Sequence, residues 1–154
     1  MHSSVQADDI PQANSSSLLE ELRKAHTGLL EAIDELRVLT LGPMPAKAKL
    51  VDTRWKVSSA SLTRRLLWGR ILMSVSGRLG PDDQTELRRL QDMDIELLRT
   101  SIKHVGTWTG EAILRDWETY CRASESMRSR MKAAIISERQ VLYPILMKVD
   151  RRAR

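Results

Sequence analysis

The sequence predicts an all-α protein with the architecture of an antiparallel, up-down-up-down four-helix bundle. Apolar residues recur at alternating spacings of three and four along four long segments, which is the periodicity of amphipathic helices. Short segments that contain proline or glycine separate them, and neither residue continues a helix readily. No segment shows the pattern of a strand, and short connections favour antiparallel packing of consecutive helices.

Length and composition fit one domain of this kind. A chain of 154 residues is long enough for one core, and 42% hydrophobic with 29% charged residues is normal for a folded domain. We expect a flexible N-terminal arm over residues 1–15, because this stretch is polar and lacks helical periodicity. The bundle is expected to span residues 16–149, and a short basic tail to follow over residues 150–154.

The first two helices are predicted on either side of a strong break at residues 41–45, which hold one glycine and two prolines. The first helix is expected over residues 16–39. The second is expected over residues 52–79, with Asp52 or Thr53 as its N-cap. The apolar stripe of the first helix includes one histidine and consists of Leu19, Leu22, His26, Leu29, Ile33 and Leu36.

The third and fourth helices are predicted from their start and stop signals. The third is expected to begin near Asp83, which stands three residues before Glu86 as in a capping box. The fourth is the longest and follows a short connection around residues 106–110. Pro144 lacks an amide hydrogen and its ring clashes with the preceding turn, so we expect the fourth helix to bend or end near Tyr143.

Three inward-facing polar residues are candidates for a metal site inside the bundle. The apolar registers place His26 on the inner face of the first helix, Asp94 on that of the third and Glu138 on that of the fourth. Bundles of this type hold metal ions with carboxylates and histidines that project from several helices. The second helix has no Asp, Glu or His between positions 53 and 81. Its inward positions are predicted to be Ser59, Leu62, Leu66 and Gly69.

Two segments resemble the hemerythrin-like (HHE) cation-binding domains of bacteria. In residues 22–36, LRKAHTGLLEAIDEL, His26 stands where this family has a metal-binding histidine within a leucine-rich helix. Residues 134–144, AIISERQVLYP, are similar to the family's HIxxEExxLFP, with Glu138 and the final leucine and proline matching. The resemblance implies a hemerythrin-like bundle with an iron site inside it.

Other positions depart from the family's metal-binding pattern. Ala134 stands in place of the motif's histidine and Arg139 in place of its second glutamate, while Asp94 takes a histidine position in the third helix. In the second helix Ser58 and Ser59 would take the ligand positions, and serine is a poor ligand for iron. The resemblance therefore implies a degenerate metal site, for which oxygen carriage and iron redox chemistry are not expected.

A buried glutamate without a metal needs another positive charge, because an unpaired buried carboxylate is costly. Arg64 and Arg65 of the second helix are the candidate charge partners of Glu138 in such a vestigial site. We therefore hypothesise that an internal charge cluster replaces the metal. In this interpretation His26 is a hydrogen-bonded core residue rather than a ligand.

Charge, hydropathy and cysteine content bear on partners and location. A net charge of +5 and a pI of about 9.7 permit weak attraction to acidic partners, but no zinc motif, helix-turn-helix or aromatic-basic pattern favours nucleic-acid binding. The longest nearly unbroken apolar run, residues 141–147, is far shorter than the roughly 20 residues that span a bilayer, so no membrane insertion is expected. With Cys121 as the only cysteine and no secretory signal at residues 1–6, we expect a cytoplasmic protein.

Enzyme signatures such as a Gly-rich phosphate loop, GxSxG and HExxH are absent from the sequence. We expect a non-catalytic protein without a cofactor, acting as a regulatory or interaction module on an unidentified protein partner, and homodimerisation stays open. One alternative is a residual metal- or oxygen-responsive protein that holds iron or another divalent metal on His26, Asp94 and Glu138. Another is a protein that binds a small apolar ligand between its helices.

Overall fold

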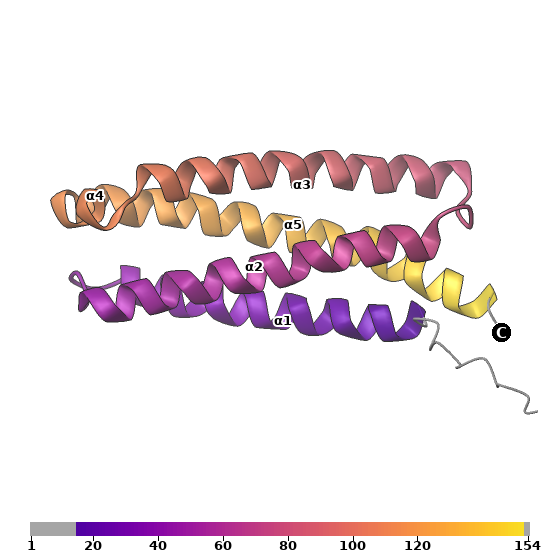
Figure 1. The fold of residues 1–154 in the computed structure, drawn as a ribbon, viewed down its shortest axis with the longest axis horizontal. Helices are drawn as coiled ribbons and strands as arrows, with labels where there is room; N and C mark the ends of the chain where they lie inside the picture. Colours follow the sequence, from indigo (N-terminus) through magenta and orange to yellow (C-terminus); the bar gives the residue numbers. More distant parts are fainter. Residues whose placement is uncertain (1–14, 153–154) are drawn as a thin grey trace, which may run out of the picture.

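The computed structural model describes residues 15–152. This part of the chain forms five helices: α1 (Ser15–Thr40), α2 (Lys47–Val75), α3 (Pro81–Thr107), α4 (Gly110–Arg115) and α5 (Trp117–Arg152). The prediction of an all-α, antiparallel helical bundle is confirmed (Figure 1). The predicted N-terminal arm lies outside the described residues apart from Ser15, as do residues 153–154 of the predicted basic tail. None of the described helices combines the length and the apolar character needed to cross a membrane.

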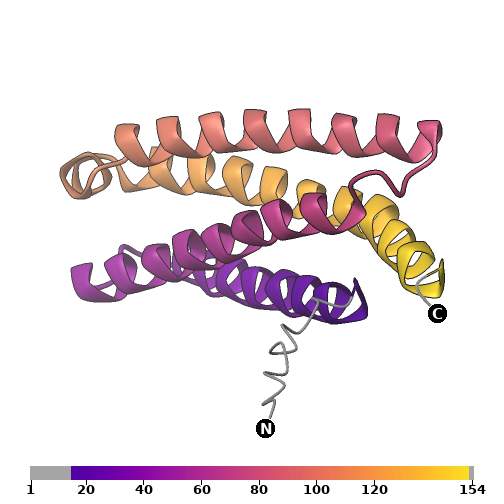
Figure 2. The ribbon, with the colours of Figure 1, turned by 45° about the vertical axis from the view of Figure 1, so that its right-hand side comes forward.

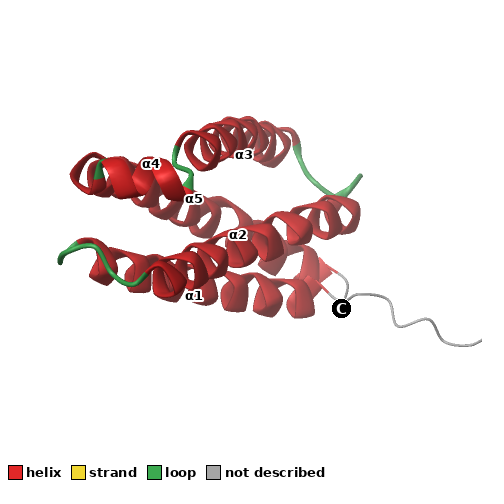
Figure 3. Cartoon of the chain, turned by 60° about the vertical axis from the view of Figure 1, so that its left-hand side comes forward, coloured by secondary structure: helices red, strands yellow, loops and turns green. Residues whose placement is uncertain are grey.

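The four long helices lie side by side, and the loops lie at the ends of the bundle (Figure 3). α1 packs along α2 and α5, α3 packs along α5, and the short α4 contacts α5. α2 approaches α3 near the turn that joins them and diverges from it toward the other end of the bundle (Figure 2). That turn contains Gly77, whose φ of 71° is a left-handed conformation that glycine adopts without strain.

A polar layer divides the core into two apolar clusters. The cluster toward the α2–α3 turn includes Leu22, Trp68 and Leu142, and the other includes Ile33 and Ile135. On each long helix, one charged or titratable residue stands where the two clusters meet. These residues are His26 on α1, Arg64 on α2, Asp94 on α3 and Glu138 on α5. The packing of the two clusters therefore brings four polar side chains to one level of the bundle.

The inner face of α2 differs from the predicted one. Leu62 and Leu66, predicted to point inward, are 54% and 66% exposed, while Ser59 is half-buried and Gly69 is exposed. The prediction was wrong because α2 carries apolar residues on two faces, so helical spacing alone did not decide which face turns inward. The buried positions of α2 are Leu50, Thr53, Val57, Ser61, Arg64, Leu67, Trp68, Ile71 and Val75.

Several helix boundaries also differ from the predicted ones. α2 ends at Val75 rather than at residue 79, and the predicted fourth helix is divided at Asp116 into α4 and α5. α2 begins at Lys47, well before Asp52, and α5 continues through Pro144 to Arg152 rather than ending near Tyr143. A proline inside a helix costs about 3 kcal/mol. The segment around it buries four apolar side chains, each of which contributes about 1.5–3 kcal/mol. These are Leu142, Ile145, Leu146 and Val149. Core packing therefore outweighs the cost of the proline and holds the last turns of α5 in place.

Candidate functional site

Four side chains from the four long helices meet inside the bundle, and we call them the charge network. They are His26, Arg64, Asp94 and Glu138. His26, Arg64 and Glu138 are 0%, 1% and 2% exposed, while Asp94 lies at the edge of the group with its side chain 16% exposed. Buried charges are costly unless each is paired and hydrogen-bonded, so the contacts of each member decide whether the group is stable.

Glu138 stands at the centre of the charge network. Its Oε2 lies 2.5 Å from Nε2 of His26. Its Oε1 accepts a hydrogen bond of 2.9 Å from Nε1 of Trp68 and another from a guanidinium nitrogen of Arg64. Both carboxylate oxygens therefore have hydrogen-bond partners, as a buried carboxylate requires.

Arg64 bridges the two carboxylates of the network. Its Nη1 donates to Glu138, and its Nη2 donates to Oδ1 of Asp94 at 2.7 Å. The neighbouring Arg65 approaches the same aspartate, with 3.6 Å between its Nε and Oδ2 of Asp94. A planar guanidinium presents donors in two directions and is suited to hold two carboxylates at once. Two carboxylates thus face two guanidinium groups, and their charges balance within the protein.

Both ring nitrogens of His26 are engaged. Because the ionised Glu138 carboxylate can only accept, Nε2 of His26 carries a hydrogen and donates it. Nδ1 lies 2.6 Å from the hydroxyl oxygen of Tyr143, and in a neutral imidazole it accepts the hydroxyl hydrogen. The two rings are stacked with their centroids 5.6 Å apart, and the guanidinium of Arg23 lies over the Tyr143 ring. These contacts fix the orientation of the imidazole.

The geometry does not fit the iron site that the resemblance implies. Among residues 15–152, no group of three or more His, Cys, Asp or Glu side chains is arranged to hold a metal ion. The structure does bring His26, Asp94 and Glu138 together, with Arg64 rather than Arg65 as the direct partner of Glu138. The guanidinium lies between the two carboxylates, so a divalent cation there would meet a like charge at close range.

Two contacts of the network were not predicted from the sequence. Trp68 donates to Glu138, and it stands four residues after Arg64, which places both on one face of α2. That spacing could have pointed to Trp68, had the inner face of α2 been known. Tyr143 belongs to the motif that suggested the resemblance, but its contact with His26 joins α5 to α1 and carries no signal in the local sequence.

Comparisons with known proteins do not assign this chain to a family. The chain matches no protein family model, and no curated protein or solved structure is significantly similar to it. The function is therefore argued from the fold and from the contacts of the charge network.

Proposed function

We propose that this protein is a non-catalytic helical bundle of hemerythrin-like descent in which the charge network has replaced a metal, and that it acts through binding as a regulatory or interaction module. The observation that carries the proposal is Arg64, a buried cation that donates to both Asp94 and Glu138. These are two positions at which the resemblance implies metal ligands. A guanidinium supplies the positive charge that the carboxylates need, and it belongs to the chain itself.

The burial of the network supports a structural rather than a catalytic role. A general acid or base must come within hydrogen-bond reach of its substrate, at about 2.6–3.2 Å. His26 and Glu138 are 0% and 2% exposed, and their polar side-chain atoms already bind protein groups. A substrate would reach them only if the helices separated, which would cost the burial of both apolar clusters.

An exposed apolar face on α2 supports a role in binding. We call it the α2 apolar stripe; its members are Val51, Trp55, Leu62, Leu66 and Met73, each more than half exposed. They follow one another at spacings of four and seven, so they share one side of the helix. Contiguous exposed apolar patches mark interaction surfaces. Apart from the buried Arg64, α2 carries six Lys or Arg residues and a single acid, Asp52, so a partner with acidic residues around an apolar face fits best.

Metal analysis of the purified protein tests the first part of this proposal. After expression in medium supplemented with iron, manganese and zinc, we expect each metal far below one ion per chain. We also expect no rise in melting temperature when these ions are added, because a ligand that binds only the folded state would stabilise it. Stoichiometric metal, or a melting temperature that rises with metal, would overturn the proposal.

Sedimentation velocity tests the second part. The double variant Leu62→Glu, Leu66→Glu places two charges on the α2 apolar stripe and should keep the fold, since both residues are exposed. If the wild-type protein associates as its concentration rises, the double variant should stay monomeric. A wild-type monomer at all concentrations would exclude self-association through the stripe. Unfolding of the double variant would show that the stripe is structural and contradict the proposed surface.

A further inference from the structure

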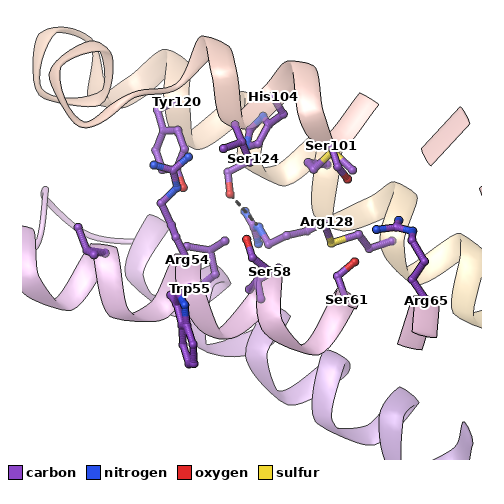
Figure 4. A pocket seen from close by; sticks show the side chains of 16 residues that line it. Arg54, Trp55, Ser58, Ser61, Arg65, Ser101, His104, Tyr120, Ser124 and Arg128 are labelled. Carbon is purple, nitrogen blue, oxygen red and sulfur yellow. Dashed lines mark hydrogen bonds between the residues drawn. The ribbon is translucent and has the colours of Figure 1, made fainter. Parts of the chain in front are cut away.

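A half-open cavity lies between α2, α3 and α5, and we call it the cleft. It is located where α2 diverges from α3, and Figure 4 shows side chains from these helices around it. Its volume of about 380 Å³ falls within the range of roughly 300–1,000 Å³ in which proteins bind small molecules. The cleft is therefore large enough for a small organic ligand.

The cleft is lined by cations and by no carboxylate. Its charged and titratable lining consists of Arg54, Arg65, Arg128, His104 and Tyr120. Arg128 is only 7% exposed, yet its hydrogen-bond partners are hydroxyls: its guanidinium donates to Ser124 at 3.4 Å and to Thr40 at 3.1 Å. Within residues 15–152 no carboxylate lies at ion-pair distance from Arg54 or Arg128; Glu125 acts on Arg128 only from farther away. A buried guanidinium without a counter-charge is costly, and an anion in the cleft would offset that cost.

Unpartnered polar atoms point to the same place. Six buried side-chain nitrogen and oxygen atoms of the described residues have no hydrogen-bond partner, and four of them belong to residues that line the cleft. These four are Nε and Nη2 of Arg65, Oγ of Ser101 and Oη of Tyr120. Because the charge of Arg65 is already paired with Asp94, the two hydroxyls are the atoms that carry the argument. Tyr120 is 0% exposed, and its hydroxyl lies near Ser124 without forming a hydrogen bond of good geometry. Buried polar groups are normally satisfied, so a ligand that accepts hydrogen bonds would complete the site.

The donors of the cleft gather around Tyr120. The guanidinium of Arg54 lies over the Tyr120 ring, with its carbon 5.6 Å from the ring centroid. The His104 ring also stacks on the Tyr120 ring, with 6.2 Å between the two centroids. Burial and the positive charge of Arg54 lower the pKa of His104 below its usual 6.5. The imidazole is therefore neutral at pH 7, and the fixed positive charge comes from the arginines.

The remaining lining is apolar and suits the body of a ligand. Leu36, Val57, Met127 and Met131 are buried around the cleft, and two of them are methionines, which adapt readily to irregular shapes. Charge and apolar surface thus occur together. An inorganic anion would satisfy only the charges, and a hydrocarbon would satisfy only the apolar lining.

We propose that the cleft binds a small amphipathic carboxylate, with its anionic group near Arg54, Arg128 and the Tyr120 hydroxyl and its apolar body against Met127 and Met131. This site goes beyond the proposed function, since it does not depend on whether the charge network has replaced a metal. It also names a ligand class different from the small apolar ligand that the sequence left open as an alternative.

Calorimetric titration with octanoate and with octan-1-ol tests the proposal, because the two probes share an apolar chain and differ in charge. We expect octanoate to bind wild-type protein at one site per chain. Octan-1-ol should bind at least about tenfold more weakly, since charge-assisted hydrogen bonds add about 1.5–3 kcal/mol. Octan-1-ol binding as tightly as octanoate, or no octanoate binding, would overturn the proposal.

Three variants locate the site. Arg54→Gln should weaken octanoate binding about tenfold or more, and Tyr120→Phe about fivefold, by the usual strength of charged and neutral hydrogen bonds. Arg99→Gln is the matched control, because it removes one positive charge from an exposed position outside the cleft and should leave octanoate binding unchanged. Octanoate binding that is insensitive to both cleft variants would place the ligand elsewhere and refute the assignment.

The Tyr120→Phe variant also gives a readout without ligand. It removes a hydroxyl that has no hydrogen-bond partner within the described residues, so the melting temperature of the free protein should stay the same or rise. A clear fall would show that the hydroxyl already has a partner inside the protein, which would contradict the proposed site. This readout and the comparison of the two probes decide the question even if Arg54→Gln does not fold.

Discussion

Glu138→Gln removes the charge at the centre of the buried network while keeping the shape of the side chain. The amide oxygen can still accept from Arg64 and Trp68. The amide nitrogen would face Nε2 of His26, and the imidazole can change tautomer so that Nδ1 donates to the hydroxyl of Tyr143. The hydrogen bonds can therefore be remade, and the main loss is the ion pair between Glu138 and Arg64.

The expected loss of stability follows from this loss of charge. Breaking a buried ion pair by removing one partner costs about 3–5 kcal/mol. We expect the lower end, about 3 kcal/mol, because Arg64 keeps its hydrogen bond to Asp94. For a chain of this length, 1 kcal/mol corresponds to about 2–4 °C in melting temperature, so the midpoint should fall by about 6–12 °C.

Urea unfolding followed by circular dichroism measures the free energy of unfolding of both proteins. Glu96→Gln is the control, because Glu96 pairs with Arg99 at the surface, where the two side chains are 68% and 72% exposed. Its effect should stay within about 0.5 kcal/mol. A loss below about 1 kcal/mol in Glu138→Gln would refute the argument that a buried charge pair stabilises the bundle.

A double-mutant cycle with Arg64→Met separates the pair from the rest of the network. If Arg64 and Glu138 interact directly, the effects of the two substitutions will not add, and their coupling should be at least about 1 kcal/mol. Additive effects would show that each residue stabilises the fold independently.

Three further predictions concern other parts of the structure. Tyr143→Phe should lower the free energy of unfolding by about 1–3 kcal/mol, because Nδ1 of His26 loses its partner in a buried place; no change in urea unfolding would contradict that contact. Burial lowers the pKa of His104 in the folded protein, so at pH values just below 6.5 the unfolded chain binds a proton that the folded protein does not. The free energy of unfolding of the wild type, relative to that of His104→Asn, should therefore decrease as the pH falls. Thermal melts from pH 7.5 to 5 measure this difference, and a constant difference would refute it. Leu67→Ala should cost about 2–5 kcal/mol, whereas Leu66→Ala should cost less than about 0.5 kcal/mol, and equal losses would contradict the orientation of α2.

The local sequence was sufficient where a helix has one apolar face. α1, α3 and α5 each bury one side, so the spacing of their apolar residues predicted that His26, Asp94 and Glu138 face inward, as the structure places them. The helical segments and the Pro/Gly connections followed from the same kind of signal. Pro144 was expected to bend or end the last helix, and α5 does not end there, because packing of the following residues outweighs the lost hydrogen bond.

The local sequence was insufficient to predict which face of a helix turns inward when that face depends on the neighbouring helices. α2 has two apolar faces, and only packing against α1 selected the one that holds Arg64 and Trp68. Arg64 and Arg65 are adjacent in the sequence but lie about 100° apart around the helix, so this selection decided which of them meets Glu138.

The sequence by itself determined the helices and the polar residues on three of their inner faces, because helical periodicity is a local property of the chain. Tertiary structure decided the partners of those residues, because the charges of Glu138 and Asp94 had to be neutralised by whichever cation the packing brought within reach. The tertiary structure also determined that the cleft exists and which residues line it. Its cations and unpartnered hydroxyls come from α2, α3 and α5, so only the packing of these helices brings them together.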